Sequence, residues 1–178
     1  MSNAHIPESP WFAYREGTLA CEGVSLESIA SEVDTPAFIY SGASIDHAYR
    51  SIDQALDFAP HLIAYAVKAN GNLSILSRLA TQGSGADIVS GGELQRALKA
   101  GFPPDRIVYS GVGKRREEIV AAAKAGIRAL HVENVQEIDV VESVALELGR
   151  PLRIGLRVNP EVDAKTHPYI ATGLRESK

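Results

Sequence analysis

Lys68 is the residue of this sequence best placed for covalent chemistry. It follows an apolar run, Leu62–Val67, that is typical of a buried strand. A primary amine at the carboxyl end of such a strand is how many α/β enzymes present a nucleophile. Alternation along a strand predicts that Lys68 shares a small, open face with Ala64 and Ala66. A lone strand lysine is more often a solvated edge residue, so its chemistry depends on what surrounds it.

The elements that must position Lys68 repeat along the sequence. After residue 60, short apolar segments recur at intervals of 20 to 26 residues, with centres near Tyr65, Ile88, Val108, Leu130 and Leu156. The segments between them have helical periodicity. Asn72 and Asn134 are placed to cap two of these helices at their N-termini. Glycines follow the helices where left-handed C-caps are expected, at Gly83, Gly101, Gly126 and Gly149.

Consecutive strand–helix units of this length predict a parallel sheet, either an open doubly wound sheet or a (β/α)8 barrel. A doubly wound dinucleotide fold carries a glycine-rich fingerprint after its first strand, and Ala69–Asn72 is not one. Gly111–Lys114 lacks the full spacing of a phosphate loop. We therefore predict an α/β fold of the (β/α)8 TIM-barrel type. A complete barrel needs about 250 residues, so the five units predict an incomplete barrel cut from a longer protein.

The segment before residue 60 differs from these units. Residues 1–34 form a lead segment, in which we predict a hairpin-like start and a brief helix over residues 11–33. Thr35–Ser41 is predicted to be a strand, and a helix is predicted from Ser44 to Pro60. We expect residues 35–178 to form the N-terminal part of the barrel domain.

Composition excludes several classes of protein. Of 178 residues, 45% are hydrophobic and 22% charged, and the net charge of −4 gives no basic surface for nucleic acid or membrane. No apolar stretch approaches the roughly 20 residues that span a bilayer, and the N-terminus has no signal-peptide core. The single cysteine, Cys21, excludes an internal disulfide and is expected to be a small structural or exposed thiol. We expect a cytoplasmic protein without a metal site.

In a parallel barrel all strand carboxyl ends open on one face. That rim collects an amine, several acids, an imidazole and a guanidinium, from the segments Lys68–Asn70, Asp87–Glu93, Ser110–Gly113, His131–Asn134 and Arg157–Pro160. These groups either form a site or satisfy one another inside the barrel, and their spacing alone leaves both interpretations open.

Several motifs together resemble one known family. Tyr65–Asn70, Gly85–Leu94, Tyr109–Lys114 and Leu156–Pro160 occur in order, followed by Val162–His167 and Thr172-Gly173. This series resembles the diaminopimelate decarboxylases, which belong to the pyridoxal-phosphate decarboxylases and racemases built on an alanine-racemase-like barrel. The resemblance runs from about residue 17 onward. The lysine motif alone indicates only the wider group, and the stretch from Asn159 to Gly173 narrows it to this branch.

The resemblance implies that Lys68 holds pyridoxal 5'-phosphate as an internal aldimine. It implies that Asp87 and Arg157 line the cofactor pocket, although the two could simply pair with each other. His167, Tyr169 and Thr172 match a loop that approaches the substrate, which by composition could equally be a solvated lid. The implied reaction is decarboxylation of meso-2,6-diaminopimelate to L-lysine and carbon dioxide, in a protein that forms homodimers.

Three alternatives remain at this level. The protein could be an ornithine- or arginine-type decarboxylase, a racemase relative, or a non-catalytic fragment that needs a complementary partner. The resemblance also implies that the glycine loop for the cofactor phosphate, the acid at the ring nitrogen and a C-terminal β-domain lie beyond residue 178. We therefore expect the 178-residue chain alone to be inactive.

Overall fold

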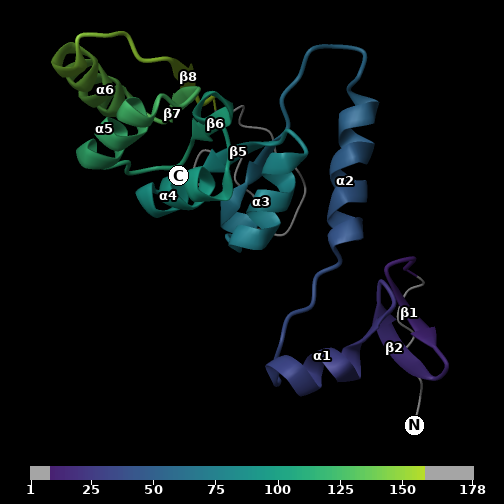
Figure 1. Ribbon diagram of the computed structural model, residues 1–178. Coiled ribbons are helices and arrows are strands. Elements are labelled where there is room, and N and C mark those ends of the chain that lie inside the picture. The colour runs from purple at the N-terminus through teal and green to yellow at the C-terminus, as the bar shows by residue number, and fades with distance from the viewer. Residues whose placement is uncertain (1–8, 159–178) are drawn as a thin grey trace.

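The N-terminal part of the described chain is a small antiparallel sheet followed by one helix. The computed structural model describes residues 9–158. The strands pair in the order β1 (Phe12–Arg15), β2 (Thr18–Cys21) and β3 (Val24–Ser25), and α1 (Leu26–Val33) follows directly. Figure 1 shows this unit at one end of the molecule, joined to α2 by an extended segment. The predicted hairpin-like start and brief helix are confirmed.

Cys21 is buried in this small sheet, with 6% of its surface exposed. Burial, and secondarily the neighbouring Glu22 carboxylate, raises the pKa of its thiol. A protonated, packed thiol is a poor nucleophile. Cys21 therefore has the structural character that the sequence suggested.

Two predictions for the following segment are wrong. Thr35–Ser41 contains no strand, because no neighbouring strand offers it backbone hydrogen bonds, and Phe38 is 91% exposed. Helix α2 (Gly42–Ala55) begins before Ser44, since the cap is Ser41, whose Oγ accepts from the Ser44 amide at 2.9 Å. The Ser41 hydroxyl also donates to Glu22 Oε1 at 2.6 Å, which ties the N-terminal unit to the start of α2.

A five-stranded parallel sheet forms the body of the molecule, with strand order β4-β5-β6-β7-β8. Its strands are β4 (Ala64–Ala66), β5 (Gly85–Ile88), β6 (Ile107–Tyr109), β7 (Ala129–Val132) and β8 (Ile154–Leu156). The connecting helices are α3 (Leu73–Thr81), α4 (Gly91–Ala100), α5 (Arg116–Ala125) and α6 (Val135–Leu148), with short 3-10 turns η1 (Val67–Ala69) and η2 (Pro104–Arg106). The predicted strand centres and the asparagine caps of α3 and α6 are confirmed.

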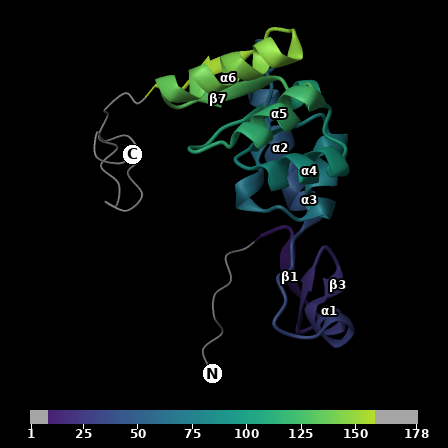
Figure 2. The ribbon, with the colours of Figure 1, turned by 90° about the vertical axis from the view of Figure 1, so that its left-hand side faces the viewer.

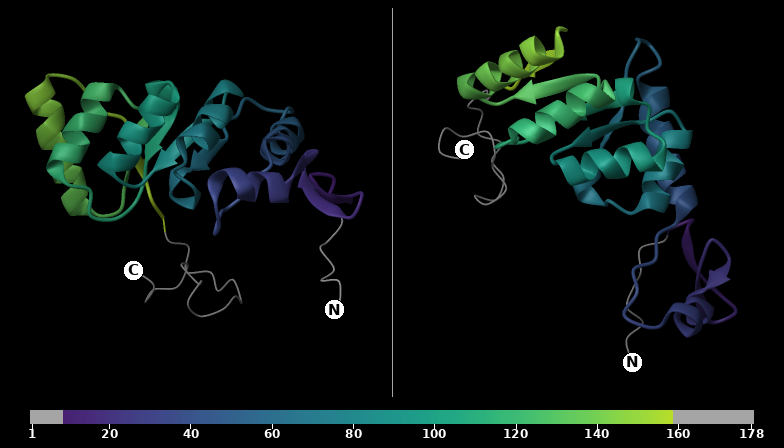
Figure 3. Two further views of the ribbon diagram at one scale, coloured as in Figure 1. Left: turned by 60° about the horizontal axis from the view of Figure 1, so that its bottom comes forward. Right: turned by 60° about the vertical axis from the view of Figure 1, so that its left-hand side comes forward.

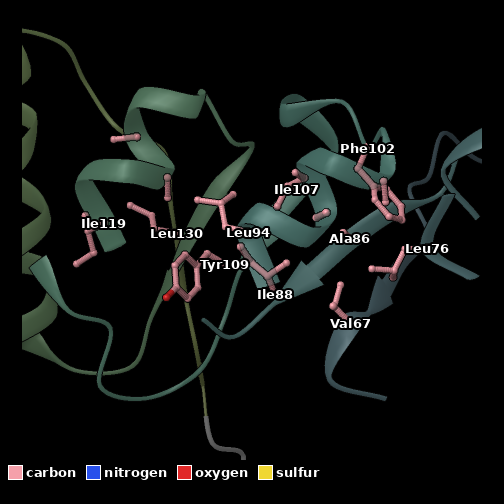
Figure 4. Packing of buried hydrophobic residues seen from close by; sticks show 14 of the residues in the cluster. Val67, Leu76, Ala86, Ile88, Leu94, Phe102, Ile107, Tyr109, Ile119 and Leu130 are labelled. Carbon is pink, nitrogen blue, oxygen red and sulfur yellow. The ribbon is translucent and has the colours of Figure 1, made fainter. Parts of the chain in front are cut away.

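All four helices after α2 pack on one face of this sheet. Alternate strand residues point into the shared core, namely Ala86, Ile88, Ile107, Tyr109, Leu130 and Val132 (Figure 4). They meet the apolar stripes of the helices, including Leu76, Leu94, Ile119 and Val144. Figures 2 and 3 show α3 to α6 following one another along this side. The opposite face carries no helix in the described part of the chain.

Helices on only one face of the sheet distinguish between the two predicted folds, the open doubly wound sheet and the barrel. A doubly wound sheet has helices on both faces, whereas a barrel has them only outside. Sequential strand order with helices on one face is the arrangement of a barrel segment, which confirms the predicted fold class. The last strand, β8, is an edge, and its helix-side residues Ile154 and Leu156 are 40% and 69% exposed.

None of the helices in residues 9–158 is long and apolar enough to cross a membrane.

Gly85, the first residue of β5, tests how tightly the sheet is packed. A Cβ there would lie 2.4 Å from the backbone oxygen of Arg106 and 3.3 Å from Leu62. Because backbone cannot move aside cheaply, we expect Gly85→Ala to lower the free energy of unfolding by about 1–3 kcal/mol. Gly71→Ala is the matched control, since the nearest atom to its Cβ is 3.7 Å away, on Arg96. Denaturant unfolding of both variants measures the difference, and equal stabilities would contradict the packing.

Candidate active site

Lys68 lies just past the carboxyl end of β4, in the 3-10 turn η1. β4 pairs with β5 only from Ala64 to Ala66, so the strand alternation used to orient Lys68 stops two residues too early, and that prediction is wrong. Val67 anchors the turn in the core at 1% exposure, whereas Lys68 is exposed. Its ammonium group makes no hydrogen bond or ion pair with any residue from 9 to 158. No residue in that part of the chain therefore occupies the end of the Lys68 side chain.

The sheet surface beside Lys68 is built from small residues. Ala64 and Ala66 of β4 lie in register with Gly85 and Asp87 of β5, on the face away from the helices. On this face only Asp87 of the four carries a polar side chain. Gly85 is buried at the amino end of β5, so only the Ala66–Asp87 pair lies at the carboxyl end of the two strands, and it places one methyl group and one carboxylate there.

Asp87 belongs to a hydrogen-bonded row that crosses three strands. Ser110, directly after β6, donates its hydroxyl to Asp87 Oδ1 at 2.5 Å. The Ser110 hydroxyl oxygen also lies 3.0 Å from Nδ1 of His131 on β7. Since strand neighbours on one face are in register, three residues far apart in sequence meet at the carboxyl rim of the sheet.

The missing side chain at Gly155 of β8 leaves room for the His131 ring. The two residues are register partners, and a Cβ at Gly155 would lie 2.7 Å from His131 Cδ2 and 3.2 Å from Nε2. The imidazole therefore packs directly against the backbone of β8, a position that any larger residue at 155 would block.

Arg157 has a different partner from the one considered for it. Its Nη1 donates to Glu133 Oε1 at 2.9 Å, and its backbone amide donates to the carbonyl of Val132 at 3.1 Å. The Glu133 side chain is 6% exposed and that of Arg157 is 43% exposed. Arg157 and Asp87 thus stand on the same rim with separate partners, so the suggested direct pairing does not form.

A buried ion pair closes the loop after β6. Lys114 Nζ lies 3.1 Å from Glu137 Oε2 and donates to the carbonyl of Gly111 at 2.7 Å. The side chains of Lys114 and Glu137 are 2% and 10% exposed. Glu137 Oε2 also accepts from the Glu133 amide at 3.0 Å, so one carboxylate joins the loop to the start of α6. The loop is therefore a βα turn that an ion pair and hydrogen bonds hold in place.

Two further acids act as helix caps. The Glu93 amide donates to Oγ of the N-cap residue Ser90 at 3.2 Å, and Glu93 Oε2 accepts from the amide of Val89, the residue before the cap, at 2.7 Å. Glu118 accepts from the backbone amides of Arg115 and Gly91, and these hydrogen bonds hold the pKa of its carboxyl below the usual value. For Glu93 the structure favours the helix-terminus role over an active-site role.

Three predicted site residues, His167, Tyr169 and Thr172, lie outside the described residues. The sequence had placed Ser110 and His131 at the rim without giving either a role. Period-two alternation in the strands was a signal for both, since it set them opposite the core residues Tyr109 and Leu130.

Comparisons with known proteins give the family and the fold. Residues 42–178 match the family model described as pyridoxal-dependent decarboxylase, pyridoxal binding domain. A diaminopimelate decarboxylase of Pseudomonas aeruginosa is 49% identical over 167 residues, which is 94% of this chain and 40% of that protein. The chain thus spans about 40% of the length of the curated relatives it matches.

Solved structures separate near relatives from distant ones. The crystal structure of a diaminopimelate decarboxylase from Helicobacter pylori, complexed with L-lysine, has a TM-score of 0.82 and 51% identity, and the match covers 84% of this chain and 38% of that one. An arginine decarboxylase of Paramecium bursaria Chlorella virus has a TM-score of 0.61 at 19% identity, with 75% of this chain and 35% of that one covered. The second likeness shows the fold alone.

The Lys114–Glu137 pair is expected to be a main source of rigidity at the rim. Lys114→Met leaves a buried carboxylate without its cation, and we expect a loss of about 3–5 kcal/mol in the free energy of unfolding. Adding Glu137→Gln removes that charge but keeps an acceptor for the Glu133 amide, so the double variant should recover about 1–3 kcal/mol. Lys99→Met, at an exposed position, is the control and should stay within about 0.5 kcal/mol. A double variant less stable than Lys114→Met would refute the pairing.

Proposed function

The chain belongs to the pyridoxal-dependent decarboxylases, whose pyridoxal-binding domain it matches from residue 42, and from this we propose that its protein decarboxylates meso-2,6-diaminopimelate to L-lysine and carbon dioxide. The observation that carries the proposal is the unpartnered Lys68 amine at the rim of a barrel-type sheet. The choice of substrate is supported by relatives near 50% identity that are named diaminopimelate decarboxylase, against 19% for the arginine decarboxylase.

The described residues fit pyridoxal 5'-phosphate. An aldehyde cofactor needs a free primary amine, and Lys68 supplies one. A flat aromatic ring needs a sheet surface without bulky side chains beside that amine, and the small residue Ala66 lies there at the carboxyl end of β4. When bound, the cofactor supplies the electron sink for the carbanion that forms as the carboxylate leaves.

The chain's own residues bind and orient in this scheme. Lys68 would hold the cofactor through its Nζ, and the same atom would hold a proton at the rim when the cofactor is not attached to it. Asp87 offers a carboxylate on the strand next to that of Lys68. Arg157, held by Glu133, places a positive charge at the far side of the same rim. His167, Tyr169 and Thr172 complete the proposal as a substrate-facing loop.

The wider organisation is also part of the proposal. Residues 35–178 form the N-terminal part of the barrel domain, and residues 1–34 form a lead segment. The protein works in the cytoplasm as a homodimer on a small amino-acid substrate, without nucleic acid or membrane partners. Its acidic balance, with a net charge of −4, supports the last point.

Substrate competition tests the activity. The whole protein that carries this chain, loaded with pyridoxal phosphate, is expected to release carbon dioxide from meso-diaminopimelate and to yield L-lysine. With L-ornithine or L-arginine its kcat/KM should be lower by at least about 100-fold. Diaminopimelate carries an amino and a carboxyl group at both ends, and a site that binds both pairs is left with unpaired polar groups when ornithine or arginine is bound. The 178-residue chain alone should release none.

A preference for ornithine or arginine would favour the other decarboxylase branch. Cofactor binding with no carbon dioxide from any of the three substrates would favour a non-catalytic role with a complementary partner. Turnover by the 178-residue chain would contradict the expectation that the rest of the protein supplies part of the site.

A further inference from the structure

The Asp87–Ser110–His131 row is the most organised polar feature on the helix-free face of the sheet. We propose that Ser110 and His131 are positioning residues that hold Asp87 as an ionised hydrogen-bond acceptor on the rim it shares with Lys68. The proposal deepens the proposed function and rests on it, because the rim matters only if Lys68 carries the cofactor.

The proton count of the row fixes its direction. A serine hydroxyl has one proton, and the 2.5 Å contact between Ser110 Oγ and Asp87 Oδ1 requires a proton between the two oxygens. If Ser110 supplies it, Ser110 Oγ can only accept from His131, so Nδ1 of the imidazole carries a proton. If Ser110 instead donated to His131, Asp87 would have to be protonated. The charge of Asp87 and the tautomer of His131 are therefore linked, because an ionised Asp87 requires a proton on His131 Nδ1.

The length of the Ser110–Asp87 contact favours the first arrangement. Its 2.5 Å separation is that of a charge-assisted O–H···O⁻ hydrogen bond, in which the hydroxyl donates to an ionised carboxylate. The His131 ring lies next to Gly155, where no side chain separates it from β8, and its Nδ1 lies 3.0 Å from Ser110 Oγ. Nδ1 is therefore placed to donate to the hydroxyl oxygen.

Asp87 gains a fixed orientation from this. Oδ1 is taken by Ser110, whereas Oδ2 accepts no hydrogen bond from the residues between 9 and 158. One oxygen is thus held in place by Ser110, and the other is open. Asp87 also lies in register with Ala66, two residues before Lys68. An oriented, ionised acceptor at that place can hold a cationic group that arrives at the rim.

The competing explanation is that the Asp87–Ser110–His131 row only stabilises the sheet, because hydrogen bonds between strands do so as well. The two explanations differ in what they require of the side chain at position 131. A purely stabilising role requires a suitable shape and good packing, whereas a positioning role requires a proton donor at the place of Nδ1. His131→Asn keeps an N–H close to that position, and His131→Leu fills similar space without one.

The experiment uses the whole protein and four variants: Ser110→Ala, Ser110→Thr, His131→Leu and His131→Asn. Three quantities are measured: kcat for carbon dioxide release and, without substrate, the affinity and the absorption spectrum of bound pyridoxal phosphate. Ser110→Ala and His131→Leu should each lower kcat by about 10- to 100-fold and alter the spectrum, because the carboxylate loses its set orientation. Ser110→Thr and His131→Asn should lose no more than about threefold.

The double variant Ser110→Ala/His131→Leu gives the sharpest result. If His131 acts only through Ser110, the double variant should be no worse than Ser110→Ala alone. Losses that multiply, or a His131→Asn variant as impaired as His131→Leu, would overturn the proposal. So would variants that lower the melting temperature but leave kcat and spectrum unchanged. If the parent protein bound the cofactor but decarboxylated nothing, the proposed function would fail, while the spectra would still decide the role of the row.

Discussion

One-sided burial of the parallel sheet is the constraint on which the rest of the structure depends. The alternate residues Ala86, Ile88, Ile107, Tyr109, Leu130 and Val132 all enter the helix-packed core. Their neighbours along each strand must then point to the other face, where Asp87 and His131 lie. Because sequential parallel strands end at the same edge, the polar residues at those ends meet although the chain separates them by twenty or more residues. The site is thus a consequence of how the core is packed.

The rim combines a free amine with rigid polar supports. Lys68 leaves the strand in a 3-10 turn whose neighbour Val67 is locked in the core, so its base is fixed while its amine stays open. Around it, Arg157 is held by Glu133, and Lys114 by Glu137. In the proposed function, groups already held in position would lower the free-energy cost of orienting cofactor and substrate.

Sequence patterns predicted the parts of this structure that depend on local signals. The strand centres, the caps at Asn72 and Asn134, and the left-handed ends at Gly101 and Gly126 follow from residue type and spacing. Features set by distant pairing were missed. Whether Thr35–Ser41 becomes a strand depends on a partner strand, and where β4 ends depends on β5. The Ser110–His131 and Lys114–Glu137 contacts depend on strand register and loop packing, which the local pattern does not contain.

In the proposed function, Lys68 binds the cofactor covalently, and this can be tested directly. The whole protein is loaded with pyridoxal phosphate, reduced with borohydride and digested, and the modified lysine is located by mass spectrometry. Our account predicts a reduced pyridoxyl group on Lys68 and its loss in Lys68→Ala, with Lys99→Ala as the unaffected control. A label on another lysine, or no label in a protein that binds the cofactor, would contradict it.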